Sequence, residues 1–326
     1  MSLDADLIVD RRRMRRKLTF WRVLAVLIAT GAIVAVTATV TRRDGGGLTA
    51  GSDHIARVRI TGLIRNDQER VDSLERLAKS GRAKAVIVHI DSPGGTTAGS
   101  EQLHQALKGV AAAKPLVVVV DGLAASGGYI AAMSADHIVA QETSLVGSIG
   151  VLFQYPNVGE LLKMVGVKVE EIKSSPLKAA PNGYEPTSPE ARAAIEALVK
   201  DSYGWFRNMV RDRRKMEGPA LDTVTDGRVF TGRQALTLRL VDQIGNEKTA
   251  VAWLTTEKGI KADTPVRDWK LKPRFGDLTM LHLAAALVLD AVGLRSVAAH
   301  IEGSVQAVER LNLDGLLALW HPPVAN

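Results

Sequence analysis

Through the middle of the chain, the spacing of apolar positions alternates between patterns typical of strands and patterns typical of helices. Residues 55–64 and the continuous apolar runs at 85–90 and 116–120 predict strands. Between them, residues 69–80, with apolar side chains at helical spacing, and residues 98–112 predict helices. Because continuous apolar strands that alternate with helices form parallel sheets covered on both faces, this pattern predicts a layered α/β fold.

Shorter elements continue the pattern. Residues 137–140 and 148–153 predict short strands, and residues 91–96, which read Asp-Ser-Pro-Gly-Gly-Thr, predict a turn. A helix is predicted over residues 188–214, because Ser-Pro-Glu at its beginning is typical of a helix start.

The N-terminal region predicts a membrane anchor. Residues 1–44 hold nine Arg or Lys and four Asp, a net charge of +5 out of +7 for all 326 residues. The basic cluster ends at Arg22, and the uncharged stretch 23–41 is 19 residues long, enough for one membrane span. The positive-inside rule then keeps residues 1–22 in the cytoplasm, and residues 42–53 lead as a linker to a domain outside the membrane. A cleaved signal peptide and a buried globular helix are the alternatives.

Composition excludes several other kinds of site. The chain has no cysteine, which excludes disulfides and thiolate metal sites. Beyond residue 44 the charges are interleaved and sum to +2, and aromatic residues make up 4% of the chain, so no nucleic-acid partner is expected. No metal and no cofactor are predicted.

The apolar run at 116–120 leads to a bend that contains Ser126. The residues around the bend are Ala, Gly and Ser, which predicts a buried strand, a sharp turn and a helix start. Such a turn exposes the serine Oγ, and the amides that follow it are free to hold an oxyanion. Ser126 is therefore a candidate nucleophile, and the chain is a candidate enzyme.

Ser126 needs a base, and lysine is favoured over histidine. No histidine has a sequence context typical of a Ser-His-Asp triad, which is left as an unsupported alternative. A lysine serves as a base only where desolvation lowers its pKa. Lys178 lies among proline, leucine and alanine, whereas Lys173 follows Glu170 and Glu171 and is expected to be solvated.

Five short motifs occur together in one order. They are DSPGG at 91–95, AASGGY at 124–129, VGSIGV at 146–151, IKSSPLK at 172–178 and DGRVFTGRQA at 226–235. With these motifs, the chain resembles the signal peptide peptidase A (protease IV) family. Members of this family are membrane-anchored bacterial Ser/Lys peptidases of the ClpP/crotonase-like superfamily. The resemblance covers about residues 54–258 and the N-terminal anchor.

The resemblance implies a role for each matching position. Ser126 is the expected nucleophile, Lys178 the general base, Ser148 the residue that orients the lysine amine, and Gly95 and Gly127 the donors of an oxyanion hole. The implied fold is a crotonase/ClpP-like arrangement of layered parallel sheets with flanking helices. The implied substrates are remnant signal peptides and other unfolded apolar peptides. Members of this length resemble subunits of a homo-octamer in which adjacent protomers share each Ser/Lys site.

The C-terminal region, residues 259–326, is predicted to be a helical extension whose role stays open. Residues 277–294 are strongly apolar and are expected to form an amphipathic helix, and residues 316–320 add a further apolar patch.

Two other functions remain as alternatives for the whole chain. One is a crotonase-like acyl-CoA enzyme, and the other is a non-catalytic membrane scaffold that binds apolar peptides.

Overall fold

The computed structural model describes residues 52–271 and 316–320. The predicted membrane span at 23–41 and the apolar segment at 277–294 lie outside these ranges. Among the described residues, no helix combines the length and the apolar character that crossing a membrane requires.

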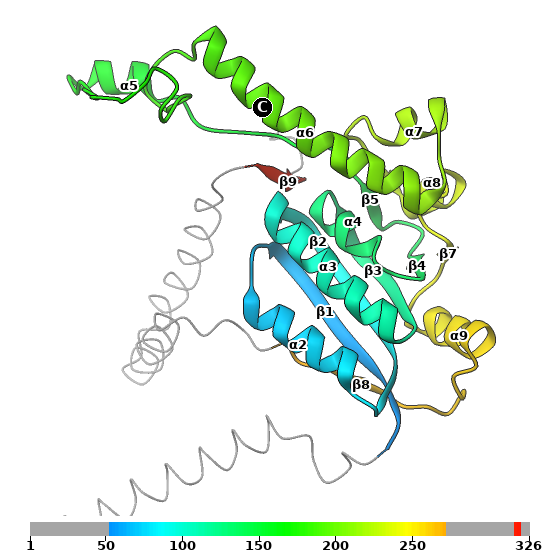
Figure 1. Ribbon diagram of the computed structural model, residues 1–326. Helices are drawn as coiled ribbons and strands as arrows, with labels where there is room; N and C mark the ends of the chain where they lie inside the picture. Colours follow the sequence, from blue (N-terminus) through cyan, green and yellow to red (C-terminus); the bar gives the residue numbers. More distant parts are fainter. Residues whose placement is uncertain (1–51, 272–315, 321–326) are drawn as a thin grey trace, which may run out of the picture. The chain divides into compact units, whose positions relative to one another are not determined.

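In the part of the chain that the structure describes, nine strands form a mostly parallel sheet at the centre of the fold (Figure 1). Its main path runs β6-β5-β3-β2-β1-β8, with β4 beside β3, β7 beside β4, and β9 beside the end of β2. The β5–β6 and β2–β9 pairs are antiparallel, and the others are parallel. The strands are β1 (His54–Ile64), β2 (Ala83–Thr96), β3 (Leu116–Ala125), β4 (His137–Ala140), β5 (Leu145–Gly147), β6 (Val229–Thr231), β7 (Gln243–Ile244), β8 (Val266–Asp268) and β9 (Leu317–Leu319).

Several helices begin where the sequence supplies a cap. Asp67, Thr96 and Ser188 each accept a hydrogen bond from the backbone N–H three residues ahead, which satisfies a donor that the first helical turn leaves free. The helices are α2 (Gln68–Lys79), α3 (Thr97–Ala113), α4 (Gly127–Ala132), α5 (Gly159–Met164), α6 (Pro189–Arg214), α7 (Gly218–Val224), α8 (Gly232–Thr237) and α9 (Glu247–Lys258).

Both faces of the central strands are covered, as the continuous apolar runs predict. On one face, Leu74 of α2 and Leu107 of α3 pack with Val88 of β2 in a large buried cluster. On the other face, Ile87 of β2 packs with Leu254 of α9 in a smaller one. Neighbouring residues of β2 thus point into different clusters, as the side-chain alternation of a strand requires. The predicted α/β fold with a parallel sheet and flanking helices is confirmed.

Two predicted elements are wrong. Residues 91–96 form no turn but continue β2, because they pair with β1 on one side and with β9 on the other. Neighbouring backbone on both sides keeps this Pro- and Gly-containing segment extended, and register shifts mark where it departs from a regular strand. The strand predicted at 148–153 lies instead at 145–147, and Leu152 makes only an isolated bridge.

Candidate functional site

Three strands bring the sequence motifs to one edge of the sheet. Ala125 at the end of β3 pairs with Gly147 at the end of β5, and Ser92 of β2 pairs with the residue before Ala125. Ser126 and Ser148 therefore each follow one of two directly paired residues. The carboxyl ends of parallel strands are where α/β proteins hold their ligands, so this edge is the candidate site (Figure 1).

Ser126 has a strained backbone. Its φ is +53° and its ψ is −115°, which costs a residue with a side chain about 1–3 kcal/mol. Its N–H donates to the Gly147 carbonyl at 2.7 Å, and its own carbonyl accepts from the N–H of Tyr129 at 2.9 Å. These bonds hold the bend between β3 and α4. The predicted sequence of strand, bend and helix is confirmed.

Ser148 lies next to that bend and also has a positive φ, which is unusual for a residue with a side chain. Its φ is +51°, and its N–H donates to the Arg228 carbonyl at 2.8 Å. Like Ser126, it is buried. Strained residues of this kind concentrate at functional sites, and these two lie at the ends of neighbouring strands.

The glycines of the predicted oxyanion hole lie where backbone segments crowd together. A Cβ built on Gly95 would stand 1.8 Å from the carbonyl oxygen of Ile64, and one built on Gly127 would stand 2.1 Å from Ser100 Oγ. A Cβ on Gly94 would stand 2.7 Å from the backbone nitrogen of Gly127. Glycine allows these close approaches because it has no side chain. The two glycine segments thus meet at the bend that follows β3.

Lys178 is not brought to this edge within the single chain. It is exposed in the segment 165–188 between α5 and α6, and Figure 1 shows α5 far from α4. Among the described residues, no side-chain hydrogen bond or ion pair of Lys178 is found. Lys173 is not simply solvated, because its amine pairs with Glu171 and lies 3.4 Å from Glu185.

Two of the described histidines have partners other than the Ser126 hydroxyl. His104 Nδ1 donates to the Ile130 carbonyl at 2.8 Å, and burial lowers the pKa of His104. His137 stacks on Trp253 with 4.7 Å between ring centroids. Among the described residues, neither histidine makes a hydrogen bond to the Ser126 hydroxyl.

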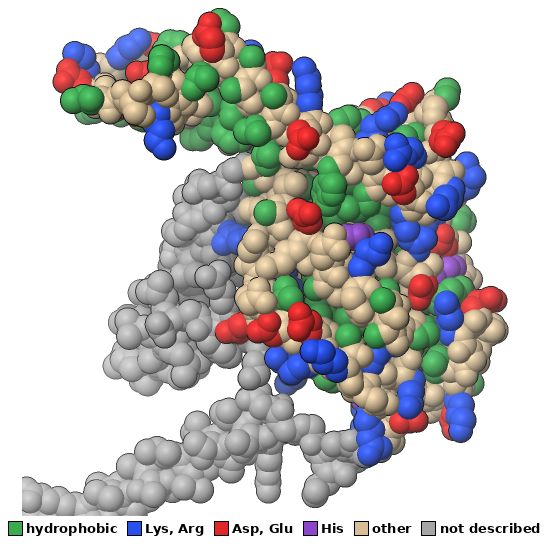
Figure 2. Space-filling view, in the orientation of Figure 1, with side chains coloured by type: hydrophobic (Ala, Val, Ile, Leu, Met, Phe, Trp, Pro, Cys, Tyr) green, Lys and Arg blue, Asp and Glu red, His purple; other side chains and the backbone are tan. Residues whose placement is uncertain are grey.

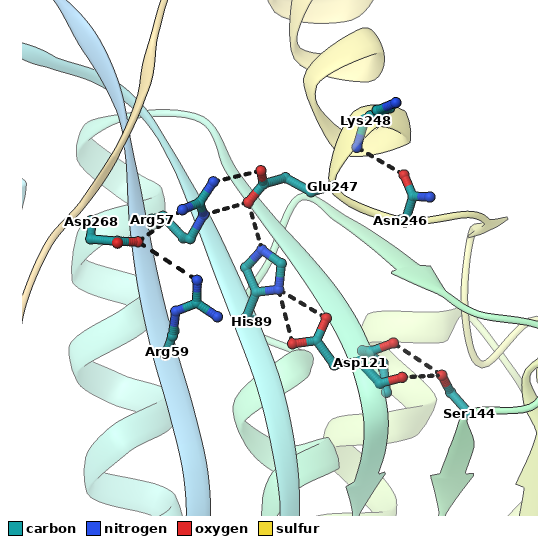
Figure 3. Close-up of polar contacts among 10 residues, drawn as sticks. Arg57, Arg59, His89, Asp121, Ser144, Asn246, Glu247, Lys248 and Asp268 are labelled. Carbon is teal, nitrogen blue, oxygen red and sulfur yellow. Dashed lines mark hydrogen bonds and ion pairs between the residues drawn. The ribbon is translucent and has the colours of Figure 1, made fainter.

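A third histidine, His89, belongs to a polar network that the sequence did not reveal (Figure 3). Its Nδ1 lies 2.9 Å from the Asp121 carboxylate, and its Nε2 lies 2.9 Å from Glu247. Arg57 donates to Glu247 at 2.5 and 2.7 Å and to Asp268 at 3.0 Å. The bond between Arg57 and Glu247 raises the pKa of the former and lowers the pKa of the latter.

This network is structural rather than triad-like. Both nitrogens of His89 face carboxylates, so neither is placed to take a proton from a hydroxyl. The nearby Ser144 Oγ lies 3.0 Å from the backbone carbonyls of Val120 and Asp121 and donates to them. The network joins α9 to the sheet. The only signal for it in the sequence is the presence of charged positions inside otherwise apolar strands.

Comparison with known proteins identifies the family. Residues 108–261 match the model of peptidase family S49. A Synechocystis sp. protein provisionally named a protease is 36% identical over 210 residues, which cover 64% of this chain and 76% of that protein. The chain belongs to peptidase family S49. S49 is a family of serine peptidases, so the predicted enzyme class and family are confirmed.

Other S49 relatives are longer than the region they share with this chain. The chloroplastic serine protease SPPA of Arabidopsis thaliana is 31% identical over 63% of this chain and 32% of its own length. An Enterococcus faecium protein provisionally named signal peptide peptidase SppA is 32% identical over 63% of this chain and 60% of its own length. Among solved structures, a mutant of Listeria monocytogenes ClpP1 aligns with a TM-score of 0.39 and 16% identity, covering 58% of this chain and 91% of that one.

Proposed function

We propose that this S49 peptidase is a membrane-anchored Ser/Lys endopeptidase in which Ser126 is the nucleophile. The observation that carries the proposal is the strained Ser126 bend, with the Gly95 and Gly127 segments meeting beside it. These are the parts that acyl transfer needs, a hydroxyl held at a sharp turn and backbone amides near the reacting carbonyl. The proposed fold assignment is the ClpP/crotonase-like superfamily.

The proposed base is Lys178. Its amine takes the Ser126 proton as Oγ attacks a peptide carbonyl and later gives that proton to the leaving amine, and Ser148 orients the amine. A lysine in water is neutral in only about one molecule in a few thousand at neutral pH. The exposed Lys178 of one chain therefore needs a covering surface before it can act.

A second copy of the chain is the proposed source of that surface. The apolar arm, residues 158–177, carries exposed large side chains, among them Met164, Val165 and Ile172. Figure 2 shows hydrophobic side chains gathered around α5 and the start of α6. Exposed apolar patches of this kind mark interaction sites. We propose a homo-oligomer, an octamer by family resemblance, in which the arm delivers Lys178 to Ser126 of the adjacent protomer.

The proposed location is a bacterial inner membrane. Residues 1–22 would stay in the cytoplasm, 23–41 would span the membrane, 42–53 would form a linker, and the peptidase domain, 54–258, would lie in the periplasm or outside the cell. Residues 259–326 would follow that domain as an extension. The proposed substrates are remnant signal peptides and other unfolded apolar peptides, which such a domain meets at the membrane surface.

Complementation between variants tests the shared site. The full chain in detergent should hydrolyse a synthetic signal peptide, and Ser126→Ala and Lys178→Ala should each abolish hydrolysis. Mixed oligomers of the two variants should regain activity, because some interfaces then join an intact serine to an intact lysine. Lys200→Ala is the control, since Lys200 is exposed on α6, outside the apolar arm. Inactive mixed oligomers would refute the shared site, and an active Ser126→Ala enzyme would refute the nucleophile.

A further inference from the structure

Residues 316–320 form a strand across the candidate site. Leu317–Leu319 pair antiparallel with residues 94–96 of β2, and the Trp320 N–H donates to the Pro93 carbonyl at 2.7 Å. On its other side the strand makes two backbone hydrogen bonds of 3.0 Å with Leu152. β9 thus adds a strand between two segments of the domain, as bound peptides do when they extend a sheet.

The register places one carbonyl of this strand at the predicted oxyanion hole. Thr97 N–H donates to the Leu316 carbonyl at 3.0 Å. Hydrogen-bonded pairs recur at every second position of an antiparallel ladder. Thr97 and Leu316 are one such hydrogen-bonded pair. Gly95 lies two positions before Thr97, and its partner Ala318 lies two positions after Leu316. Gly95 and Ala318 are therefore the next hydrogen-bonded pair. In such a pair the Gly95 N–H faces the Ala318 carbonyl oxygen.

The surroundings of that oxygen agree with this register. A Cβ built on Gly94 would stand 2.0 Å from the Ala318 carbonyl oxygen, and one built on Gly127 would stand 3.0 Å from it. The oxygen is therefore next to the backbone on both sides of the proposed oxyanion hole. Ala318 is fully buried, and Ser126 beside it is 1% exposed.

We infer that residues 316–320 occupy the peptide cleft as the enzyme's own substrate strand, and that Ala318–Leu319 is a bond that Ser126 cleaves. The inference rests on the proposed function of Ser126 and goes beyond it by naming a cleavage site. A peptide whose carbonyl accepts from Gly95 presents its carbonyl carbon to the serine at the adjacent bend. In β9 that residue is Ala318.

The cleavage follows the proposed acyl-enzyme route. Ser126 Oγ adds to the Ala318 carbonyl carbon, and the hydroxyl proton passes to the Lys178 amine. The bond to the Leu319 nitrogen breaks, that nitrogen receives the proton, and Ala318 remains as an ester on Ser126. Water then hydrolyses the ester, which restores the serine hydroxyl, leaves Ala318 as a carboxylate and releases residues 319–326.

The buried strand also indicates which peptides fit the cleft. Ala318 is 0% exposed, so a larger side chain at the acyl position would have to displace packed neighbours. Leu317 is buried as well, and Leu316, Leu319 and Trp320 are each partly buried. The cleft therefore favours extended apolar segments with a small residue at the acyl position.

Intact mass and peptide cleavage test the inference. The purified full chain should end at Ala318, whereas Ser126→Ala should retain residues 319–326. A synthetic peptide of residues 311–326 should be cut between Ala318 and Leu319. The peptide carrying Ala318→Arg should be cut about ten- to a hundredfold more slowly, and the peptide carrying Ala325→Arg is the matched control and should be cut normally.

The outcomes separate this inference from the proposed function. Hydrolysis of casein together with an intact C-terminus and an uncut peptide would overturn the inference and leave the peptidase proposal standing. Cleavage at another bond, or equal cleavage of the Ala318→Arg peptide, would also overturn it. Failure to hydrolyse casein as well as the peptide would refute the proposed function, and this inference with it.

Discussion

Replacing Gly127 with alanine separates the packing of α4 from the chemistry proposed at Ser126. The new methyl group would stand 2.1 Å from Ser100 Oγ, which donates to the Thr96 carbonyl at 2.9 Å. Moving that hydroxyl costs about 1–3 kcal/mol in overpacking and about 1 kcal/mol in the lost hydrogen bond. Alanine returns about 1 kcal/mol through its higher helix propensity. The net loss is about 1–3 kcal/mol, and the melting temperature should fall by about 2–10 °C.

Ser100→Ala removes the obstructing oxygen, so the Gly127→Ala/Ser100→Ala double variant should recover part of that stability.

Activity should not recover in the double variant. The methyl group would also stand 3.0 Å from the position of the Ala318 carbonyl oxygen, in the proposed oxyanion hole. We expect kcat/KM for a synthetic signal peptide to fall about a hundredfold, as when one oxyanion donor is lost, in both the single and the double variant. Recovery of activity along with stability would refute the placement of Gly127 at the reacting carbonyl.

Three further predictions concern stability, and urea denaturation measures each. Tyr129→Phe should cost about 1–3 kcal/mol, because it leaves the Leu240 carbonyl without the buried hydroxyl that donates to it at 2.7 Å; an unchanged midpoint would contradict this. The hydrogen bond from Arg57 lowers the pKa of Glu247 in the folded chain. The ionised Glu247 therefore stabilises the fold fully above the unfolded-state pKa, and this contribution is lost as pH falls through the folded-state pKa. Glu247→Gln should flatten the dependence of the free energy of unfolding on acid pH. Lys114→Met should destabilise the chain, since the amine donates to three backbone carbonyls at 2.7–3.0 Å, and the exposed Lys108→Met should not.

The parts of the fold that local pattern determines could be predicted from the sequence. The strand, bend and helix around Ser126 follow from an apolar run that ends in small residues, and the helix at 189–214 follows from its cap and its spacing. These elements depend on neighbours in sequence, so periodicity and capping suffice to find them.

Other parts depend on contacts between distant residues. Pro93 and Gly94 are typical of turns, yet pairing with β1 and β9 keeps them in a strand. β9 is three residues long and has no periodicity to detect, and its partner lies more than two hundred residues earlier in the chain. The partners of His89 likewise come from β3 and α9, so its sequence context could not name them.

The tether of β9 to its own domain has a kinetic consequence. A segment joined to its binding site competes as though it were free at about millimolar concentration. A foreign peptide of similar affinity would therefore have to reach about millimolar concentration to displace the strand. A newly made chain would therefore be a latent enzyme, and its turnover of foreign peptides would begin with a lag whose length does not depend on how much enzyme is present once the oligomer has formed.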